Sequence, residues 1–260
     1  MKRKTDRKII VISGTTSGIG KALAELYRRD GHTVVGLSRR AAPPDIAVDV
    51  TDFDAVRAAV DETYEKYGRI DTVIANAGGG LSGATELLPA DAVRAQTELN
   101  FGAALNLVSC ALGYMKSGSN AVFISSACAL FALPFRAVYC ASKAAVNMAA
   151  FGLYMELKTH GIRVSSVCPG DIKTEFTANR VKYADGGARY GETPKKSADK
   201  IDSREDKRME LSRAAKKIYK YAKKSKKPLY IVGFKYKLLN FFRHILPQKL
   251  FLNITAKMFG

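Results

Sequence analysis

Short apolar runs and longer amphipathic segments alternate along the first 170 residues of the chain. The runs are three to six residues long, rich in valine and isoleucine, and bounded by turn residues; they fall at 8–13, 33–37, 46–48, 72–75, 121–125 and 163–167. Continuous β-branched runs of this kind are typical of parallel strands that are buried on both faces of a sheet. We therefore predict six strands in this part of the chain.

Segments with helical periodicity separate these strands. One follows Gly20 and closes at Asp30-Gly31, a second covers 52–67, a single long helix covers 91–116, and another runs from Tyr139 to about His160. Strands that alternate with helices predict an α/β fold built on a doubly wound parallel sheet.

The remainder of the chain departs from this rhythm. Residues 171–200 carry four glycines or prolines and little periodicity, which is typical of a lid or binding loop. A very basic helix is expected at 203–227 and a seventh strand at 228–233, so that residues 1–233 form one domain. Residues 234–260 are expected to form a C-terminal helical extension.

Positive charge is concentrated near the C-terminal end. The 260 residues have a formal net charge of +18; residues 195–260 hold 19 Lys+Arg against 5 Asp+Glu, or +14, which leaves +4 for the rest. In 234–260, basic residues alternate with leucine, isoleucine and phenylalanine, as in an amphipathic hairpin, bent at Pro247, that lies on an anionic membrane. Packing on a partner subunit or over the substrate pocket is the alternative. Nucleic-acid binding is not expected, because the sequence has no groove-reading motif.

The sequence also indicates where the protein works. The apolar stretch after residues 1–8 is too short for a signal peptide, and no window of about 18 apolar residues would span a membrane. Cysteines at 110, 128, 140 and 168 lack the spacing of a zinc or redox site, and the three histidines are scattered. We expect a cytoplasmic protein, at most peripherally attached to a membrane, with reduced thiols and no metal.

Three glycines, Gly14, Gly18 and Gly20, lie where the first strand passes into the first helix. Missing side chains allow the backbone to approach a pyrophosphate, and the helix N-terminus offers free N–H groups. A tight turn alone is the alternative interpretation, but the position within a βαβ unit favours dinucleotide binding.

The residues at the end of the second strand indicate which dinucleotide the protein binds. NAD-dependent proteins commonly place a carboxylate there for the ribose 2′-OH. This chain has Arg39 and Arg40 instead, with no carboxylate before Asp45. Guanidinium groups suit a 2′-phosphate, so we predict NADPH/NADP+ rather than NADH, with Arg39 the preferred ligand over Arg40. Two solvated surface arginines are the alternative, and Asp49-Val50 is expected beside the adenine.

Tyr139 and Lys143 are four residues apart on a predicted helix, so a phenol and an ammonium lie on one face. A nearby positive charge lowers the pKa of a phenol, which prepares it for general acid–base catalysis near neutral pH.

Taken in order, these motifs resemble the short-chain dehydrogenase/reductase family over residues 6–233. The glycine-rich turn at 13–20 resembles its TGxxxGIG motif, with Ser13 in place of threonine. The remaining motif and cofactor residues that the resemblance implies are Thr16, Ser17 and Ile19 of that turn, Asn76-Ala77-Gly78, Asn100, Ser126, the Tyr139/Lys143 pair, Pro169-Gly170, Ile172 and Thr174. One departure is that the glycine after Asn100 stands one residue earlier than the family pattern has it.

The resemblance implies a Rossmann-type fold and a role for each catalytic residue. Tyr139 would donate a proton, Lys143 would lower the pKa of Tyr139 and hold the nicotinamide ribose, Ser126 would bind the substrate oxygen, and Asn100 would hold a water. It also implies a homodimer or homotetramer that pairs through the helices near 101–116 and 139–158.

The expected activity is reduction of a hydrophobic ketone or aldehyde, lipid-, steroid-, retinoid- or sphingoid-like. A 3-oxoacyl-(carrier protein) reductase, with its acidic carrier on the basic 203–227 helix, and a non-catalytic NADPH-binding scaffold are the alternatives.

Overall fold

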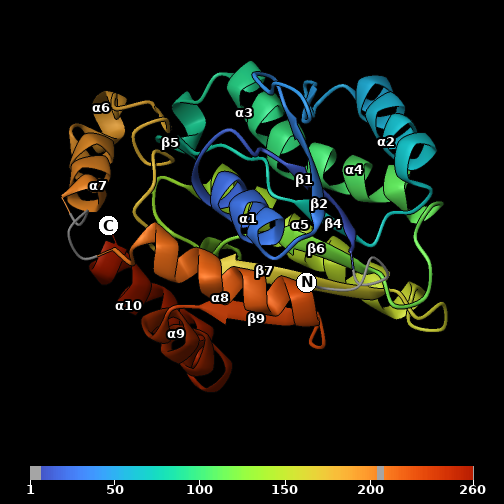
Figure 1. Cartoon of the computed structure of the whole chain (residues 1–260). Coiled ribbons are helices and arrows are strands. Elements are labelled where there is room, and N and C mark those ends of the chain that lie inside the picture. Colours follow the sequence, from blue (N-terminus) through green and yellow to red (C-terminus); the bar gives the residue numbers. More distant parts are fainter. Residues whose placement is uncertain (1–6, 204–207, 260) are drawn as a thin grey trace.

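A computed structural model describes residues 7–203 and 208–259 of the chain (Figure 1). Seven parallel strands form one sheet in the order β3-β2-β1-β4-β6-β7-β9. Their bounds are β1 Ile9–Ser13, β2 Thr33–Ser38, β3 Ile46–Ala47, β4 Thr72–Ala75, β6 Asn120–Ile124, β7 Arg163–Pro169 and β9 Leu229–Val232. The order runs outward from β1 to one edge and from β4 to the other, as in a Rossmann-type sheet. The predicted fold class is confirmed, and all seven predicted strands are found with ends shifted by at most two residues.

Helices cover both faces of the sheet (Figure 1). Helices α1 (Gly18–Arg29) and α8 (Leu211–Lys224) lie on one face, and α2 (Phe53–Tyr67), α4 (Ala103–Leu112) and α5 (Ala137–Glu156) lie on the other. Successive side chains of a strand point to opposite faces. Ile10 and Ile12 of β1 therefore join the core beneath α1 and α8, whereas Val11 joins the core beneath α2, α4 and α5. Both cores need apolar residues, which explains the continuous apolar run.

The single helix predicted at 91–116 is found as one helical run, but it ends earlier, at Leu112, and is not α-helical throughout. This part of the chain is α3 (Ala90–Thr97), a π-helical segment η3 (Glu98–Gly102) and then α4, which ends at Leu112. The Glu98 side chain folds over Gly102, where a Cβ atom would lie only 2.4 Å from its carboxylate. Single π-helical turns inside α-helices are frequent at functional sites, and this one carries Asn100.

Residues 171–200 are more regular than predicted. They contain β8 (Val181–Lys182), which pairs with β5 (Leu81–Ser82), the short helix α6 (Gly187–Tyr190), and most of α7 (Thr193–Asp202). The basic helix predicted at 203–227 begins only at Leu211, because Met209 instead forms a parallel bridge with Ile172. Part of that prediction, 204–207, lies outside the described residues.

The C-terminal extension consists of α9 (Phe234–Ile245) and α10 (Gln248–Phe259), with Pro247 between them, as predicted. Its inner side packs on the segment that follows β6 and contains the short helix η4 (Ala127–Ala129). The ring of Phe131 in that segment lies 6.2 Å from Tyr236, 6.3 Å from Phe251 and 6.0 Å from Phe259 between centroids. Within residues 7–203 and 208–259, no helix is long and apolar enough to cross a membrane.

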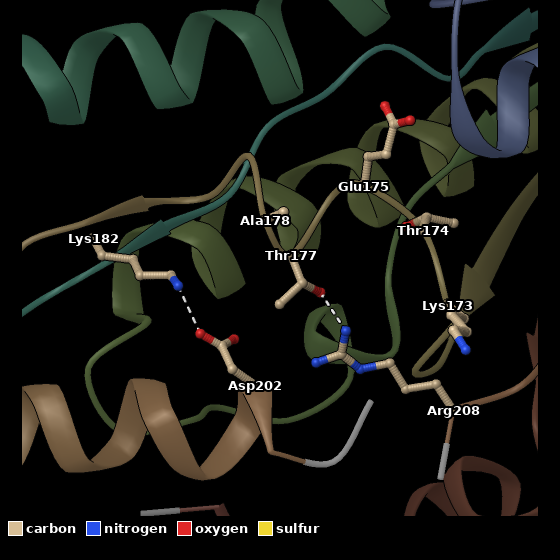
Figure 2. Close-up of a pocket in the computed structure, with 8 residues that line it drawn as sticks. All are labelled: Lys173, Thr174, Glu175, Thr177, Ala178, Lys182, Asp202 and Arg208. Carbon is tan, nitrogen blue, oxygen red and sulfur yellow. Dashed lines mark hydrogen bonds and ion pairs between the residues drawn. The ribbon is translucent and has the colours of Figure 1, made fainter. Parts of the chain in front are cut away.

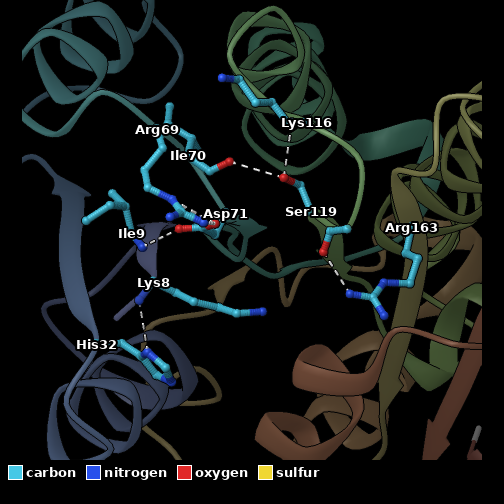
Figure 3. A network of polar contacts seen from close by, with 10 residues as sticks. Lys8, Ile9, His32, Arg69, Ile70, Asp71, Lys116, Ser119 and Arg163 are labelled. Atoms are coloured by element: carbon cyan, nitrogen blue, oxygen red, sulfur yellow. Dashed lines mark hydrogen bonds and ion pairs between the residues drawn. The ribbon is translucent and has the colours of Figure 1, made fainter. Parts of the chain in front are cut away.

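Polar contacts join the strands at the amino-terminal edge of the sheet (Figure 3). The Asp71 carboxylate accepts from the Ile9 N–H at 2.8 Å and from Arg69, while its carbonyl accepts from the Asn120 N–H at 3.0 Å. One residue therefore ties β1, β4 and β6 together. Charged groups at this edge serve the fold, whereas the candidate catalytic residues gather at the opposite, carboxyl edge.

Candidate active site

The glycine-rich turn is shaped to admit a phosphate group. Gly14 has φ +72°, a region that favours glycine, and its N–H donates to the Leu37 carbonyl at 2.8 Å. A Cβ atom on Gly20 would lie 2.0 Å from the Gly14 carbonyl oxygen, so the turn and α1 approach as closely as backbones can. A turn whose backbone N–H groups are not covered by side chains can bind the pyrophosphate of a dinucleotide.

The surroundings of the turn suit an anion as well. Ser17 precedes α1 without forming a side-chain cap, and the first turn of α1 holds no acidic residue, so its positive dipole end is not neutralised. Thr174, from the segment after β7, lies over the turn, 4.0 Å from where a Gly18 Cβ would be. Two predicted cofactor segments far apart in sequence are thereby brought together, and Thr16 of the turn is exposed.

Asn76 and Ala77 hold the turn against β4. The Asn76 amide donates to the Ser13 carbonyl at 2.9 Å, and the N–H groups of Asn76 and Ala77 both donate to the Ser13 hydroxyl, at 2.9 and 3.0 Å. Serine can replace threonine in the motif because these contacts need only the side-chain hydroxyl, which both residues have.

Arg39 and Asp49 lie together at the adenosine end of the predicted site. Both are exposed, and the pKa of Asp49 is lowered, first by hydrogen bonds from the Thr51 N–H and hydroxyl at 3.0 and 2.8 Å, and further by the charge of Arg39. Asp45 is already engaged, because its carboxylate pairs with Arg28 and accepts from the Gly36 N–H at 2.8 Å.

The other two residues predicted here differ in environment. Arg40 is exposed beside Arg39, while the Val50 side chain is buried in the core, so only the backbone of Val50 remains to face a ligand.

Ser126, Tyr139 and Lys143 are brought together at the carboxyl edge of the sheet. Ser126 follows β6, and its hydroxyl lies near enough to the phenol of Tyr139 in α5 to act on the pKa of that phenol. The neighbouring Ser125, which adjacency alone would not separate from Ser126, donates its hydroxyl to the Lys143 carbonyl at 2.9 Å and is therefore structural.

The pKa of Tyr139 is shifted in the direction opposite to the prediction. Burial raises it above its usual value near 10, and the neighbouring Cys128 thiol raises it further, although the Ser126 hydrogen bond and the charge of Arg136 oppose this. Lys143 was expected to lower it, but its ammonium donates instead to the Ile124 carbonyl at 3.2 Å. At neutral pH the phenol is therefore protonated, ready to donate rather than to accept a proton.

Burial also acts on Lys143, whose pKa it lowers to about 8 from 10.5. Below pH 8 the folded protein holds a desolvated ammonium that is solvated on unfolding, and this destabilises the fold. As pH rises from 8 to 10.5, the unfolded chain binds more protons than the folded one, so the penalty disappears.

We expect the free-energy difference between Lys143→Met and the wild type to shift by about 3 kcal/mol over that pH range, at about 1.4 kcal/mol per pKa unit. Urea unfolding at several pH values measures it, with the exposed Lys158→Met as the control. A difference that does not change with pH would show that Lys143 is solvated.

Asn100 is fully buried, and its hydrogen bonds connect helix α5, which carries Tyr139, to the segment after β4. Its side chain accepts from the Gly79 N–H at 2.9 Å and donates to the Ser142 hydroxyl at 3.0 Å, which in turn donates to the Tyr139 carbonyl at 2.9 Å. Ser142 was not predicted, although its place three residues after Tyr139 puts it on the same helix face. Because the Asn100 side chain is engaged in these bonds, its role in holding a water stays a prediction.

Gly78 lies where Asn100 and Lys143 meet. A Cβ atom on Gly78 would lie 2.9 Å from the side-chain Oδ1 of Asn100 and 3.1 Å from the Nζ of Lys143. This residue of the Asn76-Ala77-Gly78 motif therefore leaves room for both groups.

The Pro169-Gly170 segment is held from outside by the C-terminal extension. The Gly170 N–H donates to the Val232 carbonyl at 3.0 Å, and the Tyr236 ring lies so close that a Cβ on Gly170 would be 2.1 Å from it. Ile172 is buried in the bridge to Met209. Tyr236 was not predicted as part of the site, and no local pattern around it indicates this contact.

The segment after Thr174 covers the site and borders a polar pocket of about 520 Å³ (Figure 2). The Phe176 ring lies 5.9 Å from that of Tyr139, so it forms a wall beside the candidate proton donor. The pocket is lined by charged and hydroxyl groups, among them Lys182, which pairs with Asp202 at 2.6 Å, and Arg208, which donates to Thr177 at 2.9 Å. In the described part of the chain, no group of three His, Cys, Asp or Glu side chains could hold a metal ion.

This arrangement at the carboxyl edge of the sheet is that of a dinucleotide-dependent oxidoreductase. A family model described as short chain dehydrogenase matches residues 8–184, and the chain belongs to this family. Members of the family bind a nicotinamide cofactor.

Two relatives and one solved structure illustrate the similarity. The chain is 37% identical over 180 residues to a 3-ketodihydrosphingosine reductase from Bacteroides thetaiotaomicron, covering 66% of this chain and 67% of the relative. It is 27% identical over 271 aligned positions to a dehydrogenase/reductase SDR family protein 7-like from Drosophila melanogaster, covering 96% of this chain and 80% of the relative. A short-chain dehydrogenase from Streptomyces avermitilis superimposes with a TM-score of 0.82 at 26% identity, covering 92% and 93% of the two chains.

Proposed function

We propose that the protein is an NADPH-dependent reductase that reversibly converts a hydrophobic ketone or aldehyde to an alcohol. The observation that carries this proposal is the meeting of Ser126, Tyr139 and Lys143 at the edge where the bare glycine turn opens. When bound, NADPH supplies the hydride. The protonated Tyr139 phenol donates to the substrate oxygen, and Ser126 hydrogen-bonds that oxygen where negative charge develops.

The environment of Arg39 supports NADPH over NADH. Arg39 is exposed at the end of β2, whereas the nearby Asp45 carboxylate is engaged by Arg28 and Gly36. A guanidinium is therefore free for a 2′-phosphate where a carboxylate for the 2′-OH would be expected.

An apolar cavity of about 550 Å³ supports a hydrophobic substrate. It lies between the segment after Ser126, helix α5 and the C-terminal hairpin, and it is bordered by Cys128, Leu130, Phe131 and Leu246 among others. Cavities of this size and lining typically hold small apolar ligands. The name of the Bacteroides relative, a 3-ketodihydrosphingosine reductase, points to the same class of substrate.

Consumption of NADPH by the purified protein tests the proposal. We would compare lipid-like ketones in micelles with small water-soluble ketones, and NADPH with NADH. Turnover of the lipid set with NADPH supports the proposal. Equal turnover with NADH would overturn the cofactor assignment, and turnover of the soluble set alone would overturn the substrate assignment.

A 3-oxoacyl-(carrier protein) reductase is the second candidate, favoured by the outer face of α8. This face exposes Arg213, Lys216, Lys220 and Lys224, and the chain has no acidic residue after Glu210. Such a face suits an acidic carrier protein. Faster turnover of acyl groups on the carrier than of the same groups on a short thioester would favour this candidate. A non-catalytic scaffold would have no use for the complete Asn100, Ser126, Tyr139 and Lys143 set.

The outer side of α9 supports peripheral contact with an anionic membrane. Phe234, Leu238, Phe241, Phe242 and Ile245 recur at helical spacing and are exposed, with Phe234 at 81%. The extension adds five Lys and Arg and no carboxylate. Each basic residue near such a surface contributes about 1 kcal/mol of attraction. Its inner side, with Tyr236 and Phe251, packs on the segment after β6, so we propose membrane contact for the outer side alone.

We expect Phe241→Asp to weaken binding to vesicles rich in anionic lipid by at least roughly tenfold, since it removes a large apolar side chain from the contact. Cosedimentation measures the bound fraction, and Leu87→Asp, which replaces an exposed leucine elsewhere, is the matched control. Equal binding by both variants would argue against α9 as the contact. Raising the salt concentration should weaken binding, because charge contributes to it.

We also propose a homodimer or homotetramer in the cytoplasm. Met148 and Met155 of α5 are 68% and 70% exposed, on the helix expected to pair between subunits. The four cysteines are free thiols, as in a reducing compartment. A single 28.3 kDa species in light scattering would contradict the oligomer.

A further inference from the structure

Two arginines near the candidate active site, the half-buried Arg136 and the buried Arg180, have unused donors. Arg136 has a buried Nη2 atom, and Arg180 a buried Nε atom, for which the described residues provide no hydrogen-bond partner. Arg180 is only 8% exposed. A buried donor without a partner costs free energy unless a ligand satisfies it.

The local charges leave an excess of positive charge. Arg180 pairs with Asp202 at 3.1 Å, but the same carboxylate also pairs with Lys182 at 2.6 Å (Figure 2). Burial, first, and then the charge of Arg136 lower the pKa of Arg180, which Asp202 opposes. One carboxylate is therefore shared by two cations, while the charges of Arg136 and Arg208 also act on Arg180.

Arg136 acts on the group that would donate the proton, and Arg180 lies beside Phe176, whose ring is next to that group. Arg136 is the N-cap of α5, three residues before Tyr139, and its charge acts on the Tyr139 phenol. A Cβ atom on Gly80 would lie 2.9 Å from the Arg180 side chain and 3.2 Å from the Phe176 ring, which contacts Tyr139. Phe176 therefore adjoins both Arg180 and Tyr139, and the charge of Arg136 acts on both of these residues.

We propose that Arg136 and Arg180 form an anion subsite, so that the carbonyl substrate carries a carboxylate or phosphate group close to its reacting carbon. The proposal deepens the reductase function and rests on it for the identity of the substrate. A guanidinium offers planar, paired donors that match either anion. A substrate with a cationic group at this position, such as the ammonium of a sphingoid base, is disfavoured, so the subsite narrows the proposed substrates to hydrophobic ketones or aldehydes that carry an anion.

Turnover of matched substrates tests the subsite. Long-chain keto acids, their methyl esters and the corresponding keto-alkyl phosphates would be compared in the wild type, Arg136→Gln and Arg180→Gln. We expect the wild type to prefer an acid or phosphate over the ester, and each variant to lose roughly tenfold to hundredfold of that preference through KM. Arg189→Gln, in an exposed arginine of the same lid that pairs with Glu86, should keep the preference. An acid-to-ester ratio that is unchanged in both variants would overturn the proposal.

A binding measurement separates this subsite from the reductase function. With NADP+ saturating, so that Arg39 is occupied, sulfate should raise the melting temperature of the wild type and of Arg189→Gln, but not of Arg136→Gln or Arg180→Gln. Equal stabilisation of all four proteins, or of none, would overturn the subsite. If sulfate stabilises as expected but no ketone is reduced, the subsite stands and the reductase function fails.

Discussion

Replacing Tyr139 with phenylalanine should lower kcat for ketone reduction by roughly 10²–10⁴-fold, the contribution typical of a positioned general acid. The substitution removes one hydroxyl and keeps the ring against Phe176, so the fold and the binding of NADPH should persist. Burial raises the pKa of this phenol, so it remains protonated around neutral pH. Reduction should therefore change little between about pH 6 and 8, whereas oxidation of the alcohol, which needs the phenolate, should accelerate as pH rises.

Single-turnover kinetics with NADPH, followed by absorbance, measures the first effect, and pH profiles in both directions measure the second. Tyr154→Phe on the same helix is the matched control. A Tyr139→Phe rate within threefold of the wild type would remove Tyr139 from the chemistry. An alcohol oxidation rate that saturates below pH 7 would instead show that the phenol has the lowered pKa predicted from sequence.

Replacing Arg39 with alanine should raise the KM for NADPH by roughly 10–100-fold and leave the KM for NADH nearly unchanged. The reason is that charge-assisted hydrogen bonds to a phosphate contribute about 1.5–3 kcal/mol, and only NADPH carries the 2′-phosphate. With Asp45 engaged by Arg28, the variant still lacks a carboxylate for the 2′-OH, so it should become indifferent between the cofactors rather than specific for NADH.

Arg40→Ala is the control for the preceding substitution. It removes the same charge one residue later, and its effect on NADPH should be clearly smaller, because we assign the phosphate to Arg39. Equal losses for NADPH and NADH in Arg39→Ala would mean that this side chain contacts the adenine or orders Asp49. Equal losses of NADPH affinity in the two variants would mean that the loss of one positive charge lowers the affinity, whichever of the two arginines is removed.

Much of the fold was accessible from the sequence because its signals are local. The apolar runs mark the strands, since a parallel strand covered on both faces needs apolar residues throughout. Glycines mark the turn, and Tyr139 with Lys143 stand at helical spacing. The π-helical turn at Asn100 left no such signal, because a single inserted residue hardly disturbs the apolar pattern between α3 and α4.

What could not be predicted depends on contacts between distant segments. The pKa of Tyr139 follows from how deeply the completed fold buries it, so the charge of Lys143, read in isolation, indicated the wrong direction. Likewise Arg136 and Arg180 come from different segments, and only the packing of the lid reveals that their donors lack partners. Local pattern indicated which groups to propose as catalytic, but not the electrostatic environment in which they lie.

The contact between Tyr236 and Gly170 joins the C-terminal hairpin of α9 and α10 to the Pro-Gly segment of the candidate active site. A chimaera that exchanged this hairpin for the C-terminal end of another member of the family would need an aromatic residue at position 236 and a glycine at position 170. Truncation after β9 would likewise uncover the aromatic surface around Phe131 and favour aggregation. Protein engineers who redesign substrate choice in this chain should therefore treat its last helices and its Pro-Gly segment as one exchangeable block.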